Sequence, residues 1–246
     1  MLAPRPILPH EAKVAVLEVV PSGMRPTLDV SFSHGLHECY ARHGVADLAA
    51  PVADDEHALV RVVVVRDDNG VLLGGGRVHA RHARLGFPAE STLRHFAEAR
   101  ARVRGLPEND TVELAALWTT PSTSGTGIAR LVAQACLATA IYAGKRIAFT
   151  ISHAGFASVL AAVGMVALDD TPPLPFPAVG YRSRLFATDL LGCKLAMRCD
   201  REIITAIAGS LQTGAERLML NELTAIEHGR PSWTVRRTTT RMRTVA

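Results

Sequence analysis

Several features are scarce in this sequence, and each absence excludes a class of protein. The 246 residues include four cysteines, Cys39, Cys136, Cys193 and Cys199, and none of them forms a C-x-x-C pair. So few cysteines exclude a disulfide-stabilised scaffold and indicate a reducing compartment, so we expect a cytoplasmic protein. The longest nearly uninterrupted apolar run, 156–168, is shorter than the ~20 residues of a membrane-spanning helix. The first ten residues have early prolines and no apolar core, unlike a secretory signal.

Lysine is also rare, because 24 of the 27 basic residues are arginines, and the net charge is only +4. The arginines are unevenly spread: the segment from Arg77 to Arg104 holds seven of them and two acids. A second basic stretch runs from His228 to the end, with five arginines and no acid. Such surfaces suit acidic partners, although a solvated basic face is the alternative. No nucleic-acid-binding motif accompanies them, so we expect no nucleic-acid partner.

The hydrophobic pattern predicts a mixed α/β domain over residues 1–190. Short β-branched runs predict strands at 13–20, 58–66, 71–79, 111–118, 147–151, 165–168 and 181–188. Helical spacing and glycine stops predict helices at 30–43, 92–104, 128–143 and 154–163. Residues 191–246 are predicted to form a helical extension: one helix capped by Asp200, a second helix near 215–227, and a mobile tail beyond Pro231.

The most informative loop is P-S-T-S-G-T-G, residues 121–127, between a predicted strand and the best predicted helix. A helix N-terminus offers free backbone N–H groups, and glycines let a phosphate approach them closely. The loop is not a Walker P-loop, because no G-K-[ST] follows, and Arg130 occupies the third glycine position of a dinucleotide fingerprint. The pattern therefore predicts a phosphate site, with an ordinary strand-to-helix turn as the alternative.

This region resembles the GNAT acyltransferase superfamily, whose pyrophosphate loop follows the pattern [RQ]-x-x-G-x-[GA]. Here the stretch is S-T-S-G-T-G, so the glycines match and Ser122 replaces the usual Arg or Gln. The next block of the family is a strand, a helix and Gly-Phe, and here it is F-T-I-S-H-A-G-F-A-S-V-L-A-A-V-G-M. Leu160 stands where many members have a tyrosine, which removes the tyrosine general acid from that position.

A narrower resemblance covers about residues 30–190. An acidic pair, Asp54 and Asp55, precedes a strand, a turn and a strand ending in Gly-x-x-Arg at Arg77, and E-L-A-A at Glu113 follows. This order is similar to that of acyl-homoserine-lactone (autoinducer) synthases and long-chain N-acyl amino acid synthases. Autoinducer synthases have E-[LI]-S-R at the last motif, and this chain lacks that arginine. The difference favours the amino acid synthases.

The resemblance implies a GNAT-like fold and an enzyme, an N-acyltransferase with no permanently bound cofactor. The acyl donor would be an acyl carrier protein or acyl-CoA, and the carrier protein would dock on the segment from Arg77 to Arg104. The acceptor would be the amine of an amino acid or a similar small molecule, with Asp54, Asp55 and Arg77 in its pocket. A backbone N–H near Leu117 would polarise the thioester. The phosphopantetheine phosphate would bind the loop residues Ser122, Ser124, Gly125, Thr126 and Gly127.

Two residues are the candidates for proton transfer. Alternation places Glu113 with Ala115 and Leu117 in an otherwise apolar strand, and loss of hydration raises the pKa of a carboxyl and suits a general base. The alternative is a structural carboxylate paired with an arginine. His153 follows the fifth strand, where an imidazole can accept or relay the amine's proton. Its alternative is a helix N-cap region capped by Ser152.

Other chemistries find little support. His34 and His37 share a helix face, but Cys39 does not, so no metal site is expected. No G-x-S-x-G elbow is present for Ser-His-Asp catalysis. Two alternative functions stay open: an autoinducer-type synthase that uses S-adenosylmethionine, and a GNAT-like domain that binds an acyl thioester or a protein without turnover.

Overall fold

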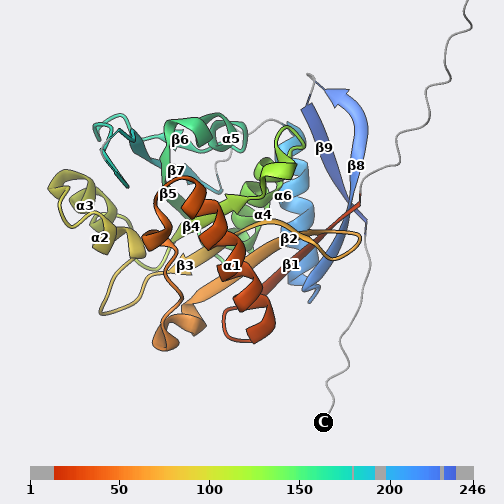
Figure 1. Cartoon of the computed structure of the whole chain (residues 1–246), viewed down its shortest axis with the longest axis horizontal. Helices are drawn as coiled ribbons and strands as arrows, with labels where there is room; N and C mark the ends of the chain where they lie inside the picture. Colours follow the sequence, from red (N-terminus) through yellow and green to blue (C-terminus); the bar gives the residue numbers. More distant parts are fainter. Residues whose placement is uncertain (1–13, 179, 192–197, 228–229, 237–246) are drawn as a thin grey trace, which may run out of the picture.

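The computed structural model describes residues 14–178, 180–191, 198–227 and 230–236 (Figure 1). Its strands are β1 (Val14–Pro21), β2 (Val60–Asp67), β3 (Leu72–Ala80), β4 (Thr111–Thr119), β5 (Ile147–His153), β6 (Val166–Ala167), β7 (Ser183–Asp189), β8 (Arg217–Glu227) and β9 (Arg230–Arg236). Its α-helices are α1 (Pro26–Arg42), α2 (Pro88–Thr92), α3 (Ala97–Arg104), α4 (Ile128–Tyr142), α5 (Ala157–Ala162) and α6 (Arg198–Gln212). Short 3₁₀ turns are η1 (Ala46–Leu48), η2 (Asp54–Leu59), η3 (Pro121–Thr123) and η4 (Ala154–Phe156).

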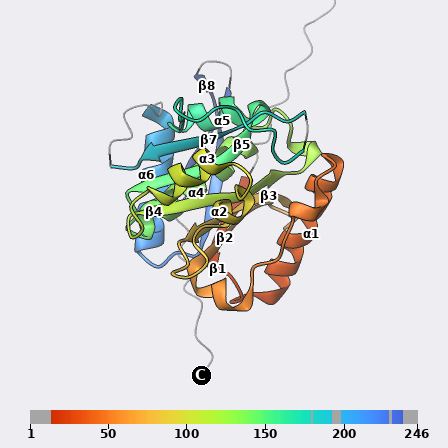
Figure 2. The ribbon, with the colours of Figure 1, turned by 90° about the vertical axis from the view of Figure 1, so that its left-hand side faces the viewer.

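The strands form one nine-stranded sheet in the order β6-β7-β5-β4-β3-β2-β1-β8-β9. The β4–β5 pair is parallel, and every other pairing of the described strands is antiparallel. In the side view α1 lies on one side of the sheet and α4 and α6 lie on the other (Figure 2). The predicted mixed α/β class is confirmed, and no helix in the described part is long and apolar enough to cross a membrane.

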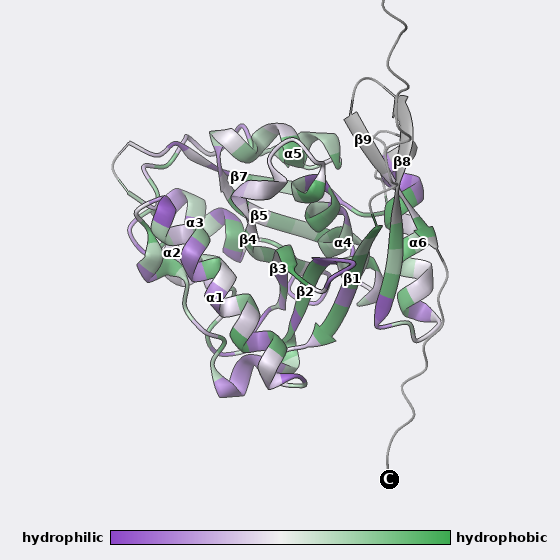
Figure 3. Ribbon diagram, turned by 45° about the vertical axis from the view of Figure 1, so that its right-hand side comes forward, coloured by the Kyte–Doolittle hydropathy of each residue, from purple (hydrophilic) through white to green (hydrophobic). Residues whose placement is uncertain are grey.

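The face covered by α4 and α6 is mostly apolar. Helix α4 has Gly127 at its N-cap, and most of its residues are buried because the helix packs against the sheet, α5 and α6 at once. Figure 3 shows the inner strands and α4 mostly in the hydrophobic colour. The cluster includes fully buried side chains from five elements: Leu17, Leu114, Leu131, Leu137, Ile207 and Leu220.

The opposite face carries α1, α2 and α3. The apolar positions of α1, spaced four, four and three residues apart, pack on β2 and β4: Leu28, Phe32, Leu36 and Cys39. The single helix predicted for 92–104 is wrong, because α2 and α3 are separate helices broken at residues 93–96. The break lets Leu93 and Val103 both face the cluster that contains Phe149.

Strands β4 and β5 diverge, and this divergence positions the site. Their ladder holds only three pairs, the last between Glu113 and Phe149, while both strands continue beyond it. On its other edge β4 contains a β-bulge, because Gly76 of β3 opposes both Ala116 and Leu117. Ala116 has a φ of 51°, a conformation that costs a non-glycine residue energy and is found at functional sites.

The C-terminal extension is only partly helical. Helix α6 is present, but the predicted helix near 215–227 is wrong: those residues form β8, which pairs with β1 and continues the sheet. Leu218 and Leu220 alternate into the core, so strand pairing overrides the helix propensity of A-E-R-L-M-L. The tail predicted to be mobile beyond Pro231 includes strand β9 up to Arg236, and residues 237–246 lie outside the described ones.

Candidate active site

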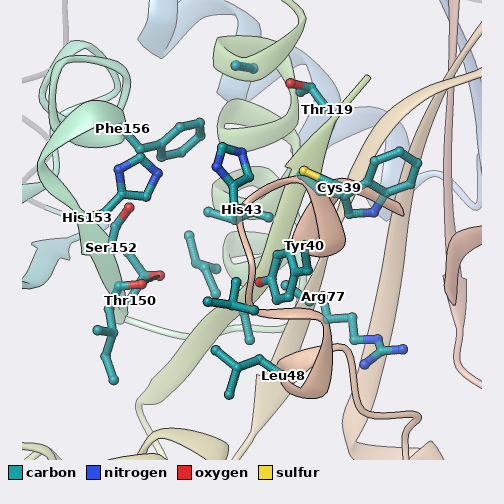
Figure 4. A pocket seen from close by; sticks show the side chains of 18 of the residues that line it. Cys39, Tyr40, His43, Leu48, Arg77, Thr119, Thr150, Ser152, His153 and Phe156 are labelled. Atoms are coloured by element: carbon teal, nitrogen blue, oxygen red, sulfur yellow. Dashed lines mark hydrogen bonds between the residues drawn. The ribbon is translucent and has the colours of Figure 1, made fainter. Parts of the chain in front are cut away.

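A cleft of about 1130 Å³ opens where β4 and β5 diverge. One wall comes from α1, η1 and β3 and the other from β5, η4 and α5, with β4 as the floor and the 121–127 loop at one end. Figure 4 shows Tyr40 and Arg77 on one wall and Thr150, Ser152 and His153 on the other. Seven of the predicted site residues line this cleft: Arg77, Glu113, Leu117, Ser124, Gly125, Gly127 and His153.

The floor of the cleft offers backbone groups that no strand uses. The N–H of Thr120 donates to the carbonyl of Leu73 in β3, at 2.9 Å. Successive amides of a strand point to opposite sides, so the amides of Leu117 and Thr119 face the gap left by β5. A side chain at Gly76 would meet Leu117 at 2.6 Å, so this glycine lets β4 approach β3 closely at the bulge. Leu117, whose N–H is predicted to polarise a carbonyl, lines the cleft beside this gap.

Glu113 lies at the inner end of the gap, where the β4–β5 ladder stops. Its carboxylate accepts a hydrogen bond from the backbone N–H of Ala89 at 2.8 Å, and among the described residues it forms no ion pair. Burial raises the pKa of Glu113 to about 8; the Ala89 hydrogen bond opposes this shift, and nearby Glu90 adds to it. The alternative of a carboxylate neutralised by an arginine does not hold here.

The bulge also changes which side chains accompany Glu113. Val112, Leu114 and Leu117 pack in the α4-side cluster, whereas Trp118 packs with α1. The predicted alternation, with Leu117 beside Glu113 and Trp118 opposite, is therefore wrong beyond Ala115. One extra residue reverses the faces of everything that follows it in the strand.

The wall beside Glu113 is buried and polar. His79 is its cross-strand partner, and burial followed by repulsion from Arg77 lowers the pKa of His79 to about 3. Burial raises the pKa of Tyr40 to about 12, and Glu113 adds to this rise while Arg77 opposes it. The Arg77 guanidinium donates to the carbonyl of Ala50 at 2.8 Å and lies over the ring of Phe32. Both His79 and Tyr40 are therefore neutral near pH 7.

His153 lies on the opposite wall, at the end of β5. It is itself the N-cap of η4: its Nδ1 accepts the N–H of Gly155 at 3.0 Å, so the predicted cap by Ser152 is wrong. Burial, followed by His43, lowers the pKa of His153, which keeps the ring neutral. With Nδ1 engaged as an acceptor, the proton of the neutral ring is assigned to Nε2. The geometry thus makes Nε2 a hydrogen-bond donor rather than the predicted proton acceptor.

The glycine loop forms the end of the cleft. Gly125 and Gly127 both have a φ near +77°, at +76° and +78°, and no side chain caps the N-terminus of α4. The first amide to bond within the helix belongs to Leu131, which leaves the preceding amides of the first turn for a ligand or solvent. Ser122 and Thr126 do not line the cleft, because their hydroxyls bond Thr120 and the carbonyl of Thr123.

The first turn of α4 is tied to the C-terminal extension. Arg130 donates from Nε to Asp200 at 2.6 Å, and Gln134 donates to the same carboxylate at 2.6 Å. Helix α6 begins at Arg198, two residues before the predicted cap Asp200, which is fully buried in the first turn and forms this ion pair. Helix α6 thereby holds the helix that carries the glycine loop.

The acidic pair does not reach the cleft. Asp54 lies 3.6 Å from His57, whose ring also contacts the hydroxyl of Ser22, and Asp55 lies beside His82 and Arg84. These contacts attach η2 to neighbouring loops. The next acid, Glu56, does line the cleft; burial lowers the pKa of Arg77, and the charge of Glu56 is among those that oppose this shift.

The segment from Arg77 to Arg104 has less unpaired positive charge than its number of arginines suggests. Arg77 is buried, and four other arginines form ion pairs: Arg81 and Arg104 with Glu90, Arg84 with Asp55, and Arg102 with Asp170. The partners lie between 9 and 68 residues away in the sequence, so a count of arginines overestimates the free charge.

Residues of the cleft that the sequence did not suggest include Tyr40, His43 and Tyr181. Tyr181 donates its hydroxyl to the carbonyl of His43 at 2.8 Å, joining α1 to the 176–183 loop. Tyr40 has the spacing of a core residue in α1, and Tyr181 follows a proline-rich loop, so neither pattern indicates a site. No group of histidines, cysteines and acids in the described part of the chain is arranged to hold a metal ion.

Comparisons with known proteins identify the fold. No protein-family model matches the sequence, and no curated protein is significantly similar to it. The structure of FeeM, an N-acyl amino acid synthase from uncultured soil microbes, superposes with a TM-score of 0.56 at 12% identity over 75% of this chain and 95% of that one. The CoA-dependent acyl-homoserine lactone synthase BjaI, with S-adenosylmethionine and isopentyl-CoA, gives 0.55 at 14% identity, covering 79% and 90%. A second such synthase, MesI, gives 0.54 at 15%, covering 78% and 95%.

The chain therefore shares its fold with an N-acyl amino acid synthase and with acyl-homoserine lactone synthases, the two groups of synthases that its sequence motifs resemble. At such low identity the likeness establishes the architecture. What the cleft does must be argued from its own residues.

Proposed function

We propose that this protein is an N-acyltransferase that moves an acyl group from a phosphopantetheine thioester to a small-molecule amine. The observation that carries the proposal is Glu113: an unpaired carboxyl with a pKa of about 8 at the inner end of the β4–β5 gap. A carboxyl of this pKa accepts a proton near neutral pH, which an amine acceptor must lose before it attacks. The neighbours FeeM and BjaI, named as acyl-transferring synthases, agree with this chemistry.

The donor would enter from the glycine loop. Its phosphate would bind at Ser124 to Gly127, on the uncapped amides at the start of α4, with the helix dipole favouring the negative charge. The pantetheine arm would then run along the gap between β4 and β5. Coenzyme A and acyl carrier proteins share this arm, and the proposal includes both donors.

The reaction needs one proton acceptor and one site for the oxyanion. Glu113, ionised, takes a proton from the acceptor's ammonium, and the free amine forms a C–N bond with the thioester carbonyl. The N–H of Leu117 stabilises the oxyanion of the tetrahedral intermediate. The C–S bond then breaks, its electron pair leaves with sulfur, and the second amine proton is released as the amide forms. The ammonium nitrogen thus loses two protons: Glu113 takes one, and the thiolate takes up the other to become a thiol.

The leaving sulfur has no tyrosine near it at position 160, because Leu160 is an apolar, fully buried residue. His153 is the imidazole on that wall, beside Thr150 and Ser152, and we assign its Nε2–H as a hydrogen-bond donor to the thioester. A neutral imidazole N–H stabilises developing negative charge without transferring its proton.

The test is acyl transfer by purified protein with acyl-CoA and acyl-carrier donors and a panel of amines, including S-adenosylmethionine. We expect thiol release coupled to an N-acyl product identified by mass spectrometry. Glu113→Gln should lower the rate at least ~10²-fold, the usual contribution of a general base. Glu18→Gln is the control for loss of a buried carboxylate outside the cleft; Glu18 lies in β1 and pairs with Arg25 and Arg66, so the rates are compared per folded protein.

The outcomes separate the functions. A lactone and methylthioadenosine made from S-adenosylmethionine would identify an autoinducer synthase instead. Donor binding without any product would leave a non-catalytic thioester-binding domain. Full activity in a folded Glu113→Gln variant would contradict the role of this carboxyl.

A further inference from the structure

A second buried carboxylate, Glu90, lies beside Glu113 and outside the cleft. Glu90 belongs to α2, is 4% exposed, and is not among the residues that line the cleft. Its neighbour in the chain, Ala89, donates the 2.8 Å backbone hydrogen bond to Glu113. Burying a negative charge next to a carboxyl that is itself buried is unfavourable, so this arrangement requires an explanation.

Three segments hold the Glu90 carboxylate in place. Arg81, just after β3, forms an ion pair with it at 3.0 Å, and Nε of Arg104, at the end of α3, donates to it at 2.9 Å. The N–H of Phe87 donates at 3.1 Å, so Glu90 also caps its own helix α2. Gly86 leaves space for the carboxylate, because a Cβ there would lie 2.3 Å from a Glu90 oxygen. The position of this charge is therefore fixed from several sides.

These bonds determine what Glu113 meets at its inner end. The cap and the two ion pairs fix the start of α2, and with it the N–H of Ala89 that bonds Glu113. They also hold the charge of Glu90 within range of Glu113, where like-charge repulsion disfavours the ionised form. A hydrogen bond that favours ionisation and a charge that opposes it thus reach Glu113 from adjacent residues of one short helix.

The other titratable groups around Glu113 do not supply a comparable charge. Tyr40, His79 and His153 are neutral near pH 7. Glu56 acts on Arg77, whose guanidinium donates to the carbonyl of Ala50 at 2.8 Å. The titratable residues of the described elements around Glu113 are Cys39 and Tyr40 from α1, Glu56 from η2, Arg77 and His79 from β3, Glu90 from α2 and His153 from β5.

We propose that Glu90 is the positioning residue of the base: its charge, held in place by two arginines, sets the pH range in which Glu113 accepts a proton. The proposal rests on the proposed acyltransferase function, in which Glu113 is the base. Glu90 acts through Glu113 and touches neither donor nor acceptor, since it does not line the cleft. Removing its charge should let Glu113 ionise at lower pH and make it a weaker base.

The first measurement follows the ionisation of Glu113 itself, which needs no enzymatic activity. Carbon NMR of protein labelled at the glutamate side-chain carboxyls gives the midpoint of its pH titration, and its resonance is the one missing from Glu113→Gln. In the wild type the midpoint should lie at about 8. Glu90→Gln keeps an oxygen for the bond to Phe87 but removes the charge. The midpoint for Glu113 should then fall by about one pH unit or more, the usual effect of one nearby charge.

Arg81→Gln and Arg104→Gln distinguish an effect of charge from a loosened helix. Each removes a positive charge from Glu90 and leaves its negative charge less compensated, so the midpoint for Glu113 should rise. A loosened α2 would instead move the midpoint in the same direction in all three variants, because each loses a contact to the same carboxylate. Arg104 is half exposed, so Arg104→Gln is the mildest of the three substitutions.

Asp170→Asn is the matched control. Asp170 pairs with Arg102 of α3 at 3.1 Å, and it does not line the cleft. This variant also deprives an α3 arginine of its carboxylate partner, but it removes no charge beside Glu113. The midpoint for Glu113 should stay at the wild-type value.

The rate of acyl transfer should follow the same shift. At about pH 6, Glu90→Gln should keep about tenfold more of its high-pH kcat/KM for the amine than the wild type keeps, because each unit of pKa changes the ionised fraction about tenfold below the midpoint. The two arginine variants should keep less of it than the wild type.

Three results would overturn the proposal: an unchanged midpoint in Glu90→Gln, shifts of one sign in Glu90→Gln and both arginine variants, or the Glu90→Gln shift repeated in Asp170→Asn. Absence of transfer to every amine, or a rate profile that does not follow the midpoint of Glu113, would instead contradict the proposed function. The NMR titration would in that case still decide whether Glu90 controls the ionisation of Glu113.

Discussion

The two faces of the central sheet differ sharply, although the same strands build both. The α4 face buries mainly aliphatic side chains, such as Leu114, Leu131 and Val132, and its buried charge, Asp200, is paired with Arg130. The α1 face, beside the cleft, buries ionisable groups among its apolar ones: Arg77, His79 and Glu113. Neighbouring residues of β3 and β4 alternate between the faces, so stability and chemistry are separated by a single residue along the strand.

The difference shows which face of the sheet lowers the stability of the fold and which face raises it. Burying an ionisable group is unfavourable unless it is paired, and Glu113 and His79 have shifted pKa values because burial disfavours their charged forms. The apolar α4 face supplies the compensating burial. Groups with shifted pKa values in a cleft are candidates for function, and the α1 face holds most of those in this chain.

The largest expected effect tests the cost of Glu113 itself. Its pKa is raised from 4.5 to about 8 on folding, so the unfolded chain ionises first and stability falls as pH rises from about 5 to 8. Glu113→Gln removes this pH-dependent loss of stability, because glutamine does not ionise. Relative to the wild type, the variant should gain on the order of 4 kcal/mol in the free energy of unfolding across that range.

Urea unfolding of both proteins at several pH values measures this gain. Glu108→Gln, at an exposed carboxylate outside the cleft, provides the control for the substitution itself. If the free energies of unfolding of the wild type and of Glu113→Gln changed in the same way with pH, burial would not have raised the pKa of this carboxyl.

The apolar face should respond in the opposite way. Leu131 is fully buried in α4 on the side away from the cleft. Leu131→Ala should lower the free energy of unfolding by about 3 kcal/mol, through lost burial and a cavity. Below its melting temperature, the variant should keep the wild-type KM for donor and acceptor. If KM changed by more than the loss of folded protein explains, the two faces would not act independently in stability and binding.

The glycine loop should lose donor binding by about tenfold or more when a side chain blocks it. Gly127→Val places a β-branched side chain at a φ of +78°, in the path of a phosphate. Gly144→Val is the control for backbone strain, since Gly144 has a φ of +69° after the other end of the same helix and open space around it. Calorimetric titration with acyl-CoA measures the affinity of both variants. Similar affinities in Gly127→Val and Gly144→Val would show that the loop is an ordinary turn and does not bind the donor phosphate.

The smallest effect concerns docking of a carrier protein. Arg102 is half exposed but paired with Asp170, so it should contribute only a few-fold to association with an acidic carrier, and only at low salt. Arg102→Gln is compared with Arg146→Gln. Arg146 is an exposed arginine just before β5, and it is paired with Asp189. The rate with acyl-CoA should not change in either variant. Identical rates with the carrier donor at low salt would remove α3 from the docking surface.

The sequence predicted the fold because its signals are local. The hairpin turn at Asp67 to Gly70, the stop at Gly144 and the β-branched strands each depend on neighbouring residues, and the structure contains these elements. It also predicted Glu113, because one carboxyl in an apolar strand stands out. The helix expected near 215–227 failed because β1 offers a pairing edge that no local pattern reveals.

The rest of the site depends on contacts between distant segments. The bulge at Ala116 exchanges the faces of Leu117 and Trp118, and alternation alone cannot show that. Asp54 and Asp55 are adjacent to Glu56, yet only Glu56 reaches the cleft, because the turns of η2 point the pair toward His57 and Arg84. The pairing of Glu90 with Arg81 and Arg104 is visible only once the fold brings these segments together.

The central claim is that Glu113 is the general base of an acyl transfer, and its pH dependence tests this most directly. The measurement is kcat/KM for the amine acceptor from pH 6 to 9.5 with saturating donor, in the wild type and in Glu113→Gln. Because the carboxyl must be ionised to accept a proton, the wild-type rate should rise with an apparent pKa of about 8. The variant should be at least ~10²-fold slower at pH 8 and should lack this rise. A wild-type profile without this transition, or the same transition in the variant, would contradict the account.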